Sequence, residues 1–176
     1  WNHADVTGAW SFDLVDLMKV DEPPAIRSLL FFLLFYGLAL RVPLFPLHGW
    51  LPVTAEHGTV AVAPVFLLGL KIGIYGLLRF VFPLLPEAVL FWHPFVVGFA
   101  VAGIFYAAVL ALLQTNLRRL LAYAVVSHTS VLVIGLFSLS HTAFQSAVML
   151  SVDFGIAIAG LFLMTGLVLR RTNTMV

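Results

Sequence analysis

The sequence contains no cysteine, and only 10% of its 176 residues are charged. The absence of cysteine excludes disulfides, thiolate metal sites and thiol nucleophiles. With 62% hydrophobic residues and a mean hydropathy of +1.08, so few charged residues leave too little polar surface to cover a soluble domain of this size. The composition therefore predicts a membrane protein.

The basic residues are few and scattered along the chain. Seven arginines and two lysines form no stripe with interleaved aromatic residues, and the formal net charge is only +1, so we expect no nucleic-acid partner. The sequence also lacks a pair of haem ligands and a glycine-rich dinucleotide motif after a strand. We therefore expect no cofactor, no metal site and no redox chemistry in this chain.

Hydrophobic runs long enough to cross a bilayer fill most of the sequence. A span needs roughly 20 apolar residues in a helix, and these runs are continuous rather than alternating, which argues against lipid-facing strands. The sequence predicts an all-α, polytopic transmembrane helix bundle with five spans, one of them broken by proline. The expected spans cover about 26–48, 60–82, 94–114, 120–139 and 142–169.

The ends of the chain are expected to lie outside the bilayer. Residues 1–24 carry five of the eight acids and predict an extramembrane loop on the periplasmic or outer side, before Pro23 and Pro24 start the first helix. Residues 25–170 hold the transmembrane helices, and 171–176 end on the cytoplasmic side. The opening residues show neither an initiating Met nor a signal peptide, so we expect the sequence to begin inside a longer protein.

The arginines predict the orientation of the bundle. Positive residues collect on the cytoplasmic side of membrane proteins. Four arginines, in the pairs 118–119 and 170–171, fall on one side of the expected topology, whereas six of the eight acids fall on the other. The acidic opening segment is therefore expected to face out.

Three ionisable residues lie deep inside the expected spans. At 1.5 Å per residue, Lys71, His128 and Asp153 are each roughly 12 to 17 Å from the start of their span. A charge near the bilayer midplane costs several kcal/mol, and such residues usually face the interior of the bundle. Three of them at one depth predict a functional layer.

Each of these residues also has a purely structural interpretation. Lys71 could extend to the surface, although its ammonium would have to pass more than about 10 Å of apolar side chains. His128 could be a packing residue hydrogen-bonded by neighbouring hydroxyls, and Asp153 could bond a neighbouring helix through a face of small residues. The remaining polar residues near span ends are interpreted as interfacial: His48, Glu56, Arg79, Arg118, Arg119, Arg170 and Arg171.

The stretch RVPLFPLHGW, residues 41–50, breaks the first span beside a charge. Pro43 and Pro46 lack an N–H, so the carbonyls of Ala39 and Val42 lose their helical partners. Free carbonyls at membrane depth need protein or water as partners, and the guanidinium of Arg41 is one such donor. A broken helix with an adjacent charge is typical of transporters and predicts a hydrated interruption of the bilayer.

These stretches, taken together, resemble a known family. RVPLFPLHGWLP, FLLGLKIGIYGLLRF, LLQTNLRRLLAYAVVSHTSVLVIG and AFQSAVMLSVDFGIAIAGLFLMTG follow one another as in the antiporter-like chain M (subunit 4) of proton-translocating NADH:quinone oxidoreductase, complex I. The resemblance covers nearly the whole sequence and implies helices seven to eleven of a subunit of roughly fourteen. It implies that Lys71 is the helix-eight lysine of the proton path, and that a partner glutamate and a second broken helix lie elsewhere in the subunit.

Two positions depart from the family pattern. The family has lysine where this chain has Arg41, and histidine where it has Phe154, with Asp153 just before it. Arginine keeps its proton near neutral pH, whereas a buried lysine can release it. The resemblance therefore implies a relay through Lys71, water, His128 and Asp153, with Arg41 as a fixed electrostatic element.

Three functions stay open at this stage. The first is a proton-translocating subunit of complex I, an enzyme subunit rather than an enzyme by itself, driven by quinone reduction elsewhere in the complex. The second is a subunit of a multi-subunit Na+/H+ antiporter or a membrane-bound hydrogenase. The third is a membrane spacer that no longer conducts, motivated by Arg41 and Phe154. The expected partners are other membrane subunits, lipid, protons and internal water, in a bacterial cytoplasmic membrane.

Overall fold

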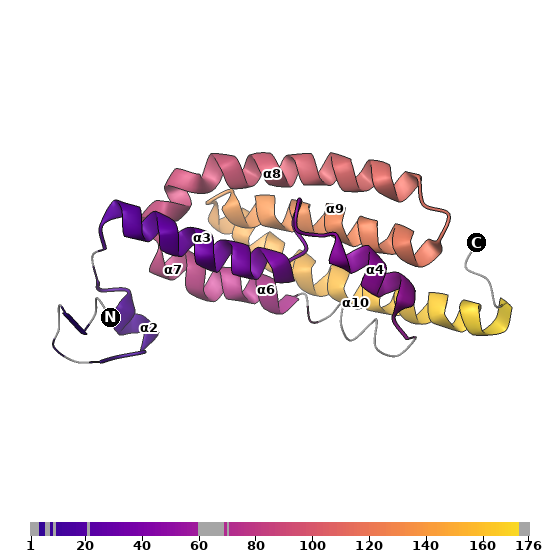
Figure 1. The fold of residues 1–176 in the computed structure, drawn as a ribbon, viewed down its shortest axis with the longest axis horizontal. Coiled ribbons are helices and arrows are strands. Elements are labelled where there is room, and N and C mark those ends of the chain that lie inside the picture. The colour runs from indigo at the N-terminus through magenta and orange to yellow at the C-terminus, as the bar shows by residue number, and fades with distance from the viewer. Residues whose placement is uncertain are drawn as a thin grey trace.

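The computed structural model of the protein describes residues 4, 5, 8, 10–20, 22–59, 69 and 71–172, and its secondary structure is helical throughout these residues. Four of the helices are long and apolar enough to cross a membrane (Figure 1). They correspond to the first, third, fourth and fifth expected spans, and the all-α, multi-pass architecture is confirmed. These helices are α3 Pro24–Arg41, α8 Pro86–Leu112, α9 Leu117–Phe137 and α10 His141–Thr172.

The second expected span, 60–82, lies partly outside the described residues. Its described part after Gly69 forms three short helices in sequence, α6 Lys71–Gly76, the π-helix η1 Leu77–Val81 and α7 Phe82–Leu84. The π-helix comes just before Pro83, which has no N–H to donate to the preceding turn. The expected total of five spans stays a prediction.

The boundaries of two spans differ from those expected. Helix α8 begins at Pro86, not near residue 94, and it runs through Pro94 without ending there. Proline is usually unfavourable in a helix interior, yet the helix continues on both sides of Pro94. Helix α3 ends at Arg41, and the chain turns before α4 Trp50–His57 begins, so the predicted break lies directly after Arg41.

Helix α9 is the most buried of the four long helices and packs against α8, α10 and α4. Asn116 caps its start, because the Asn116 side chain accepts hydrogen bonds from the backbone amides of Arg118 and Arg119. At the other end the chain reverses into α10 within three residues, and Leu139 there adopts a left-handed backbone with φ 56°. The central position of α9 places its polar residues inside the bundle.

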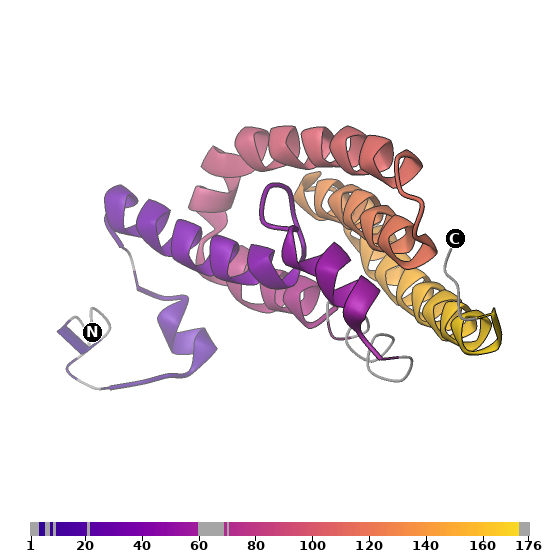
Figure 2. The ribbon, with the colours of Figure 1, turned by 45° about the vertical axis from the view of Figure 1, so that its right-hand side comes forward.

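The ends of the long helices agree with the expected topology. The turn between α8 and α9 and the end of α10 lie at one end of the bundle, and α3 runs toward this end but stops about half way along it (Figures 1 and 2). The start of α3 lies at the other end, where Arg27 forms an ion pair with Glu87. A short helix, α2 Leu14–Leu17, lies beside this second end (Figure 2). The extramembrane assignment of residues 1–24 and the direction of the bundle stay predictions.

Candidate functional site

The last backbone carbonyls of α3, just before the proline break, accept hydrogen bonds from nearby groups. The backbone amide of Leu44 donates to the carbonyl of Ala39 at 3.3 Å, and the indole of Trp50 donates to the carbonyl of Leu40 at 3.1 Å. The Ala39 carbonyl has therefore lost its helical partner at Pro43, as expected, and the protein supplies a substitute. The turn after Arg41 brings a new amide within reach of it.

Arg41 lies at the end of α3, next to the segment that carries Lys71. A Cβ placed on Gly69 would lie 3.2 Å from Nη2 of Arg41, and a Cβ on Gly73 would lie 3.3 Å from Cβ of Arg41. The side chain of Arg41 is exposed within this chain. The fixed positive charge of Arg41 therefore lies beside the chain at the start of α6, as its predicted electrostatic role requires.

Glycine at position 73 allows α6 to approach the broken helix. A Cβ there would lie 2.4 Å from Cγ2 of Val42 and 3.2 Å from its backbone nitrogen, both closer than ordinary contacts. The side chain of Val42 is fully buried. Close packing of α6 against the break thus fixes the position of Lys71 relative to Arg41.

Lys71 and His128 meet around a single aromatic ring. The ring of Phe154, on α10, stacks on the imidazole of His128, on α9, with 3.6 Å between centroids and 21° between planes. Nζ of Lys71, on α6, lies over the Phe154 ring at 5.2 Å from its centroid. Three helices therefore bring the two deepest basic residues of the predicted layer together, and Lys71 points into the bundle.

The hydroxyl neighbours of His128 are engaged with the backbone. Ser127 donates to the carbonyl of Ile104 at 3.2 Å, and Thr129 and Ser130 donate to carbonyls one turn earlier in α9. Within the described residues, Nε2 of His128 is buried and has no hydrogen-bond partner. These contacts do not support the interpretation of His128 as a packing residue held by its hydroxyl neighbours.

Asp153 lies apart from this cluster in the described structure. Its side chain is exposed on α10 and lines a shallow hollow with Gln145, Ser146 and Met149. Adjacent residues of an α-helix point about 100° apart, so Phe154 faces inward while Asp153 faces away. The structure places Phe154, rather than Asp153, between the two basic groups.

Two residues interpreted as interfacial are buried instead. His48 is only 6% exposed, and its ring lies 5.3 Å from that of Tyr106 and 6.3 Å from that of Tyr123. Arg118 is 2% exposed, and its Nη1 donates to the carbonyl of Gly58 at 2.6 Å. Position near a span end suggested the interface, but the chain after the break covers Arg118, and His48 packs against tyrosines of α8 and α9.

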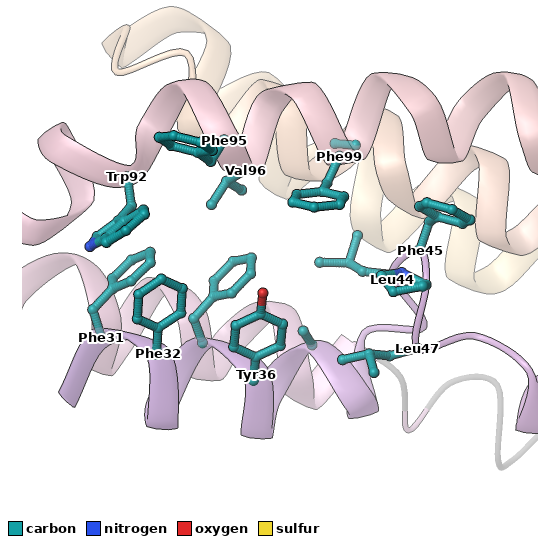
Figure 3. Close-up of a pocket in the computed structure, with 14 residues that line it drawn as sticks. Phe31, Phe32, Tyr36, Leu44, Phe45, Leu47, Trp92, Phe95, Val96 and Phe99 are labelled. Atoms are coloured by element: carbon teal, nitrogen blue, oxygen red, sulfur yellow. The ribbon is translucent and has the colours of Figure 1, made fainter. Parts of the chain in front are cut away.

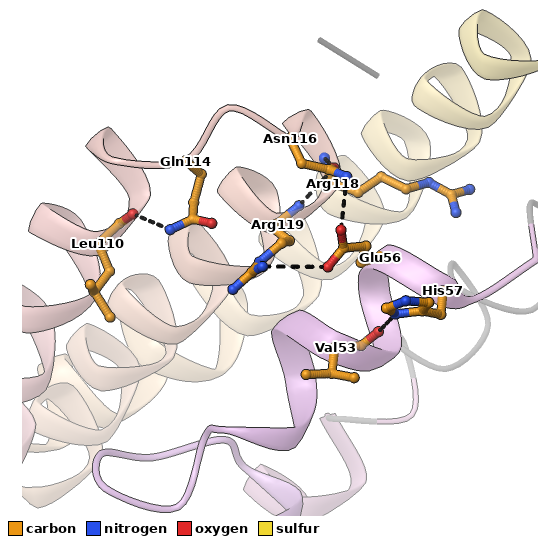
Figure 4. A network of polar contacts seen from close by, with 8 residues as sticks. All are labelled: Val53, Glu56, His57, Leu110, Gln114, Asn116, Arg118 and Arg119. Atoms are coloured by element: carbon orange, nitrogen blue, oxygen red, sulfur yellow. Dashed lines mark hydrogen bonds and ion pairs between the residues drawn. The ribbon is translucent and has the colours of Figure 1, made fainter. Parts of the chain in front are cut away.

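Arg118 belongs to a polar cluster that ties α4 to the start of α9 (Figure 4). Glu56 pairs with Arg119 at 3.6 Å and accepts a hydrogen bond from Nδ2 of Asn116 at 3.3 Å. Gly58, whose carbonyl accepts from Arg118, directly follows α4. The cluster anchors the helix after the break to the most buried helix of the bundle.

An apolar cavity of about 250 Å³ separates α3 from α8 (Figure 3). Aromatic rings line most of it, and the broken segment closes one end with Phe45 and Pro46. A lining of this kind offers no chain of proton donors and acceptors. The cluster formed by Lys71, Phe154 and His128 is therefore the better candidate for proton chemistry. The aromatic residues of the cavity are Phe31, Phe32, Phe35, Tyr36, Phe45, Trp92, Phe95 and Phe99.

The fold and this cluster define a multi-pass membrane protein with a broken helix and basic residues directed into its interior. Residues 5–175 match the family described as "NADH:quinone oxidoreductase/Mrp antiporter, TM". Because the match covers nearly the whole sequence, the chain belongs to this family of membrane subunits.

Individual relatives agree with this assignment. NADH-quinone oxidoreductase subunit M of Escherichia coli (strain K12) is 37% identical over 174 residues, which are 98% of this chain and 34% of that protein. NAD(P)H-quinone oxidoreductase chain 4 3 of Trichormus variabilis is 37% identical, over 94% of this chain and 31% of that protein. The sequence thus spans about a third of the length of these relatives.

A solved structure has the same fold. A chain of respiratory complex I from Thermus thermophilus with bound NADH superposes with a TM-score of 0.87 at 28% identity. The superposition covers 99% of this chain and 38% of that chain. The resemblance to the antiporter-like chain M of complex I is confirmed.

Proposed function

We propose that this chain is part of a proton-translocating membrane subunit of NADH:quinone oxidoreductase, complex I. In this proposal Lys71 and His128 exchange protons through internal water, and quinone reduction elsewhere in the complex supplies the energy. The observation that carries the proposal is the meeting of these two residues, from α6 and α9, around the ring of Phe154.

The energetics of a buried lysine support a role for Lys71. A lysine at the centre of a membrane helix costs about 2.5–3.5 kcal/mol on insertion scales. The ring of Phe154 offsets part of this cost, because a cation over an aromatic face gains about 2 kcal/mol when it is desolvated. A lysine held in this way can lose and regain a proton, whereas Arg41 keeps its charge and acts as a fixed electrostatic element.

His128 continues the path because imidazole titrates near neutral pH and both donates and accepts protons. Its buried Nε2, which has no partner in the described part of the chain, can accept a proton from water. Asp153 lies on the exposed side of α10. In this proposal it takes part in a later proton transfer, on a face of α10 that the rest of the subunit covers. The expected partners are other membrane subunits of complex I, within a bacterial cytoplasmic membrane.

The direct test replaces Lys71 in the full-length subunit within the assembled complex. In closed membrane vesicles supplied with NADH, Lys71→Ala is expected to abolish most of the pH gradient formed per electron transferred. Lys19→Ala is the matched control, because Lys19 is 69% exposed and pairs only with nearby Asp16 among the described residues. Wild-type proton translocation by Lys71→Ala would rule out the relay.

Sodium/proton antiport is the second candidate function, because the family description also covers antiporter subunits. It predicts that a sodium gradient drives proton movement in vesicles without NADH, and that Lys71→Ala abolishes this movement. A pH gradient that depends on NADH and is unaffected by sodium supports the first proposal. A higher rate of proton translocation in Arg41→Lys would indicate that arginine at this position limits conduction.

A further inference from the structure

Phe154 occupies the space between the two titratable groups of the relay. The imidazole of His128 covers one face of its ring at 3.6 Å, close to the van der Waals thickness of a ring, which leaves the opposite face to Nζ of Lys71. The ring is partly buried and packs against the apolar cluster around Leu51 and Phe162. It therefore lies directly across the short route from lysine to histidine.

A phenyl ring cannot carry a proton from one group to the other. Proton transfer needs a donor and an acceptor within hydrogen-bond distance, or one water between them. The ring offers no nitrogen or oxygen and displaces water from the space that it fills. While Phe154 lies between Lys71 and His128, the two groups are isolated from each other along this route.

Phe154 has small side chains beside it on its own helix. One helical turn away on either side are Ser151 and Ala157, both of them small. Besides its packing on the apolar cluster, the ring is held by the cation–π contact and the stacking on imidazole, and both depend on the charge of their partners. A change of protonation at Lys71 or His128 therefore changes the forces on the ring.

We propose that Phe154 is a gate in the relay: stacked between Lys71 and His128 it blocks proton transfer, and turned aside it lets water connect them. This inference rests on the proposed function, since a gate has a role only if protons pass between these residues. It assigns a role to Phe154, which occupies the position where the family pattern has histidine.

The test uses the full-length subunit in the assembled complex, in closed membrane vesicles, with the amount of assembled complex measured for each variant. Phe154→Leu keeps an apolar side chain but removes the aromatic face. It is expected to raise passive proton entry after an acid pulse several-fold in the absence of NADH, and to lower the protons translocated per electron. Phe162→Leu is the matched control, because Phe162 is a fully buried aromatic residue of the same helix that contacts neither basic group.

Two further variants connect the leak to the relay. Phe154→His replaces the barrier by a titratable ring of similar shape, and it is expected to raise passive proton entry even if the leucine variant assembles poorly. Adding Lys71→Ala to Phe154→Leu is expected to return the leak to the wild-type rate, because the route then lacks its lysine.

The outcomes separate the gate from the relay. If Lys71→Ala abolishes proton translocation but Phe154→Leu and Phe154→His leak no more than Phe162→Leu, Phe154 is only a packing residue and the gate is refuted. A leak in Phe154→Leu that persists in the double variant also refutes it, because protons then bypass Lys71. If Lys71→Ala translocates protons normally, the proposed function itself fails.

Discussion

The contact between Gly73 and the broken helix predicts a graded effect of adding one methyl group. In Gly73→Ala the new Cβ would lie 2.4 Å from Cγ2 of Val42 and 3.2 Å from its backbone nitrogen. Val42 is fully buried and follows the end of α3, so neither atom can withdraw without moving the backbone. Overpacking of this kind costs about 1–3 kcal/mol.

Two other glycines calibrate this estimate. A Cβ on Gly76 would meet mainly the flexible end of Leu38, at 2.6 Å from Cδ2, so Gly76→Ala is expected to cost less than Gly73→Ala. A Cβ on Gly37 would meet no atom of the described chain within 4 Å, and Gly37→Ala gains up to about 1 kcal/mol of helix propensity. The expected order of stability is therefore Gly37→Ala, then Gly76→Ala, then Gly73→Ala.

Thermal melting of the detergent-solubilised complex, followed by the loss of the intact particle, measures this order. The complex that contains Gly73→Ala is therefore expected to melt below the one that contains Gly37→Ala, with Gly76→Ala between them. Proton translocation should fall as well, because the added methyl displaces α6 and Lys71 with it. Equal melting temperatures for the Gly73 and Gly37 variants would show that α6 does not pack on the break as described.

Three further changes test the ends of α9. Asn116→Ala removes the cap of the helix and is expected to cost about 0.5–2 kcal/mol in thermal melting, while Asn116→Ser keeps a capping oxygen. Both variants lose the hydrogen bond to Glu56, so equal losses in both would exclude capping as the cause. Arg118→Ala loses the charged hydrogen bond to Gly58 and should lower the stability of the complex by about 1.5–3 kcal/mol. The control Arg171→Ala, at an exposed position, should lower it by about 0.5 kcal/mol or less. Leu139→Gly removes the steric strain of the left-handed backbone and should stabilise the complex by about 1 kcal/mol, whereas Leu139→Ala should not. A loss of stability in the glycine variant would show that the backbone at Leu139 is not strained.

Hydropathy was sufficient to predict most of the helices, because a long apolar run in a membrane has only the helix available to it. It located α9, α10 and the start of α3 to within a few residues, and it carried the first span past the end of α3 at Arg41. It placed the start of α8 too late, near 94, whereas the helix begins at Pro86 and runs through Pro94. The residue type alone does not decide whether a proline ends a helix.

The candidate site was predictable in depth but not in direction. Counting residues from the span ends placed Lys71 and His128 at one level, and the structure brings them to the same ring. The same count placed Asp153 with them, but depth along a helix does not determine which side a residue faces. The neighbouring Phe154 faces inward, and its hydrophobic character gave no sign of this position.

The burial of His48 and Arg118 was also outside the reach of local rules. Both lie near the ends of expected spans, where polar residues usually meet the interface. Arg118 is buried where the end of α4 meets the start of α9, and His48 is buried against tyrosines of α8 and α9. Contacts between segments far apart in sequence decide such cases.

The single helix α9 carries both Arg118, which holds the end of α4, and His128, which stacks on Phe154. The two residues are ten positions apart, which is about 15 Å along the helix axis. Because no loop interrupts this distance, a contact that α4 makes at Arg118 and the stacking at His128 belong to one continuous helix. If His128 carries protons as proposed, a shift of this helix at its α4 end would also move the histidine.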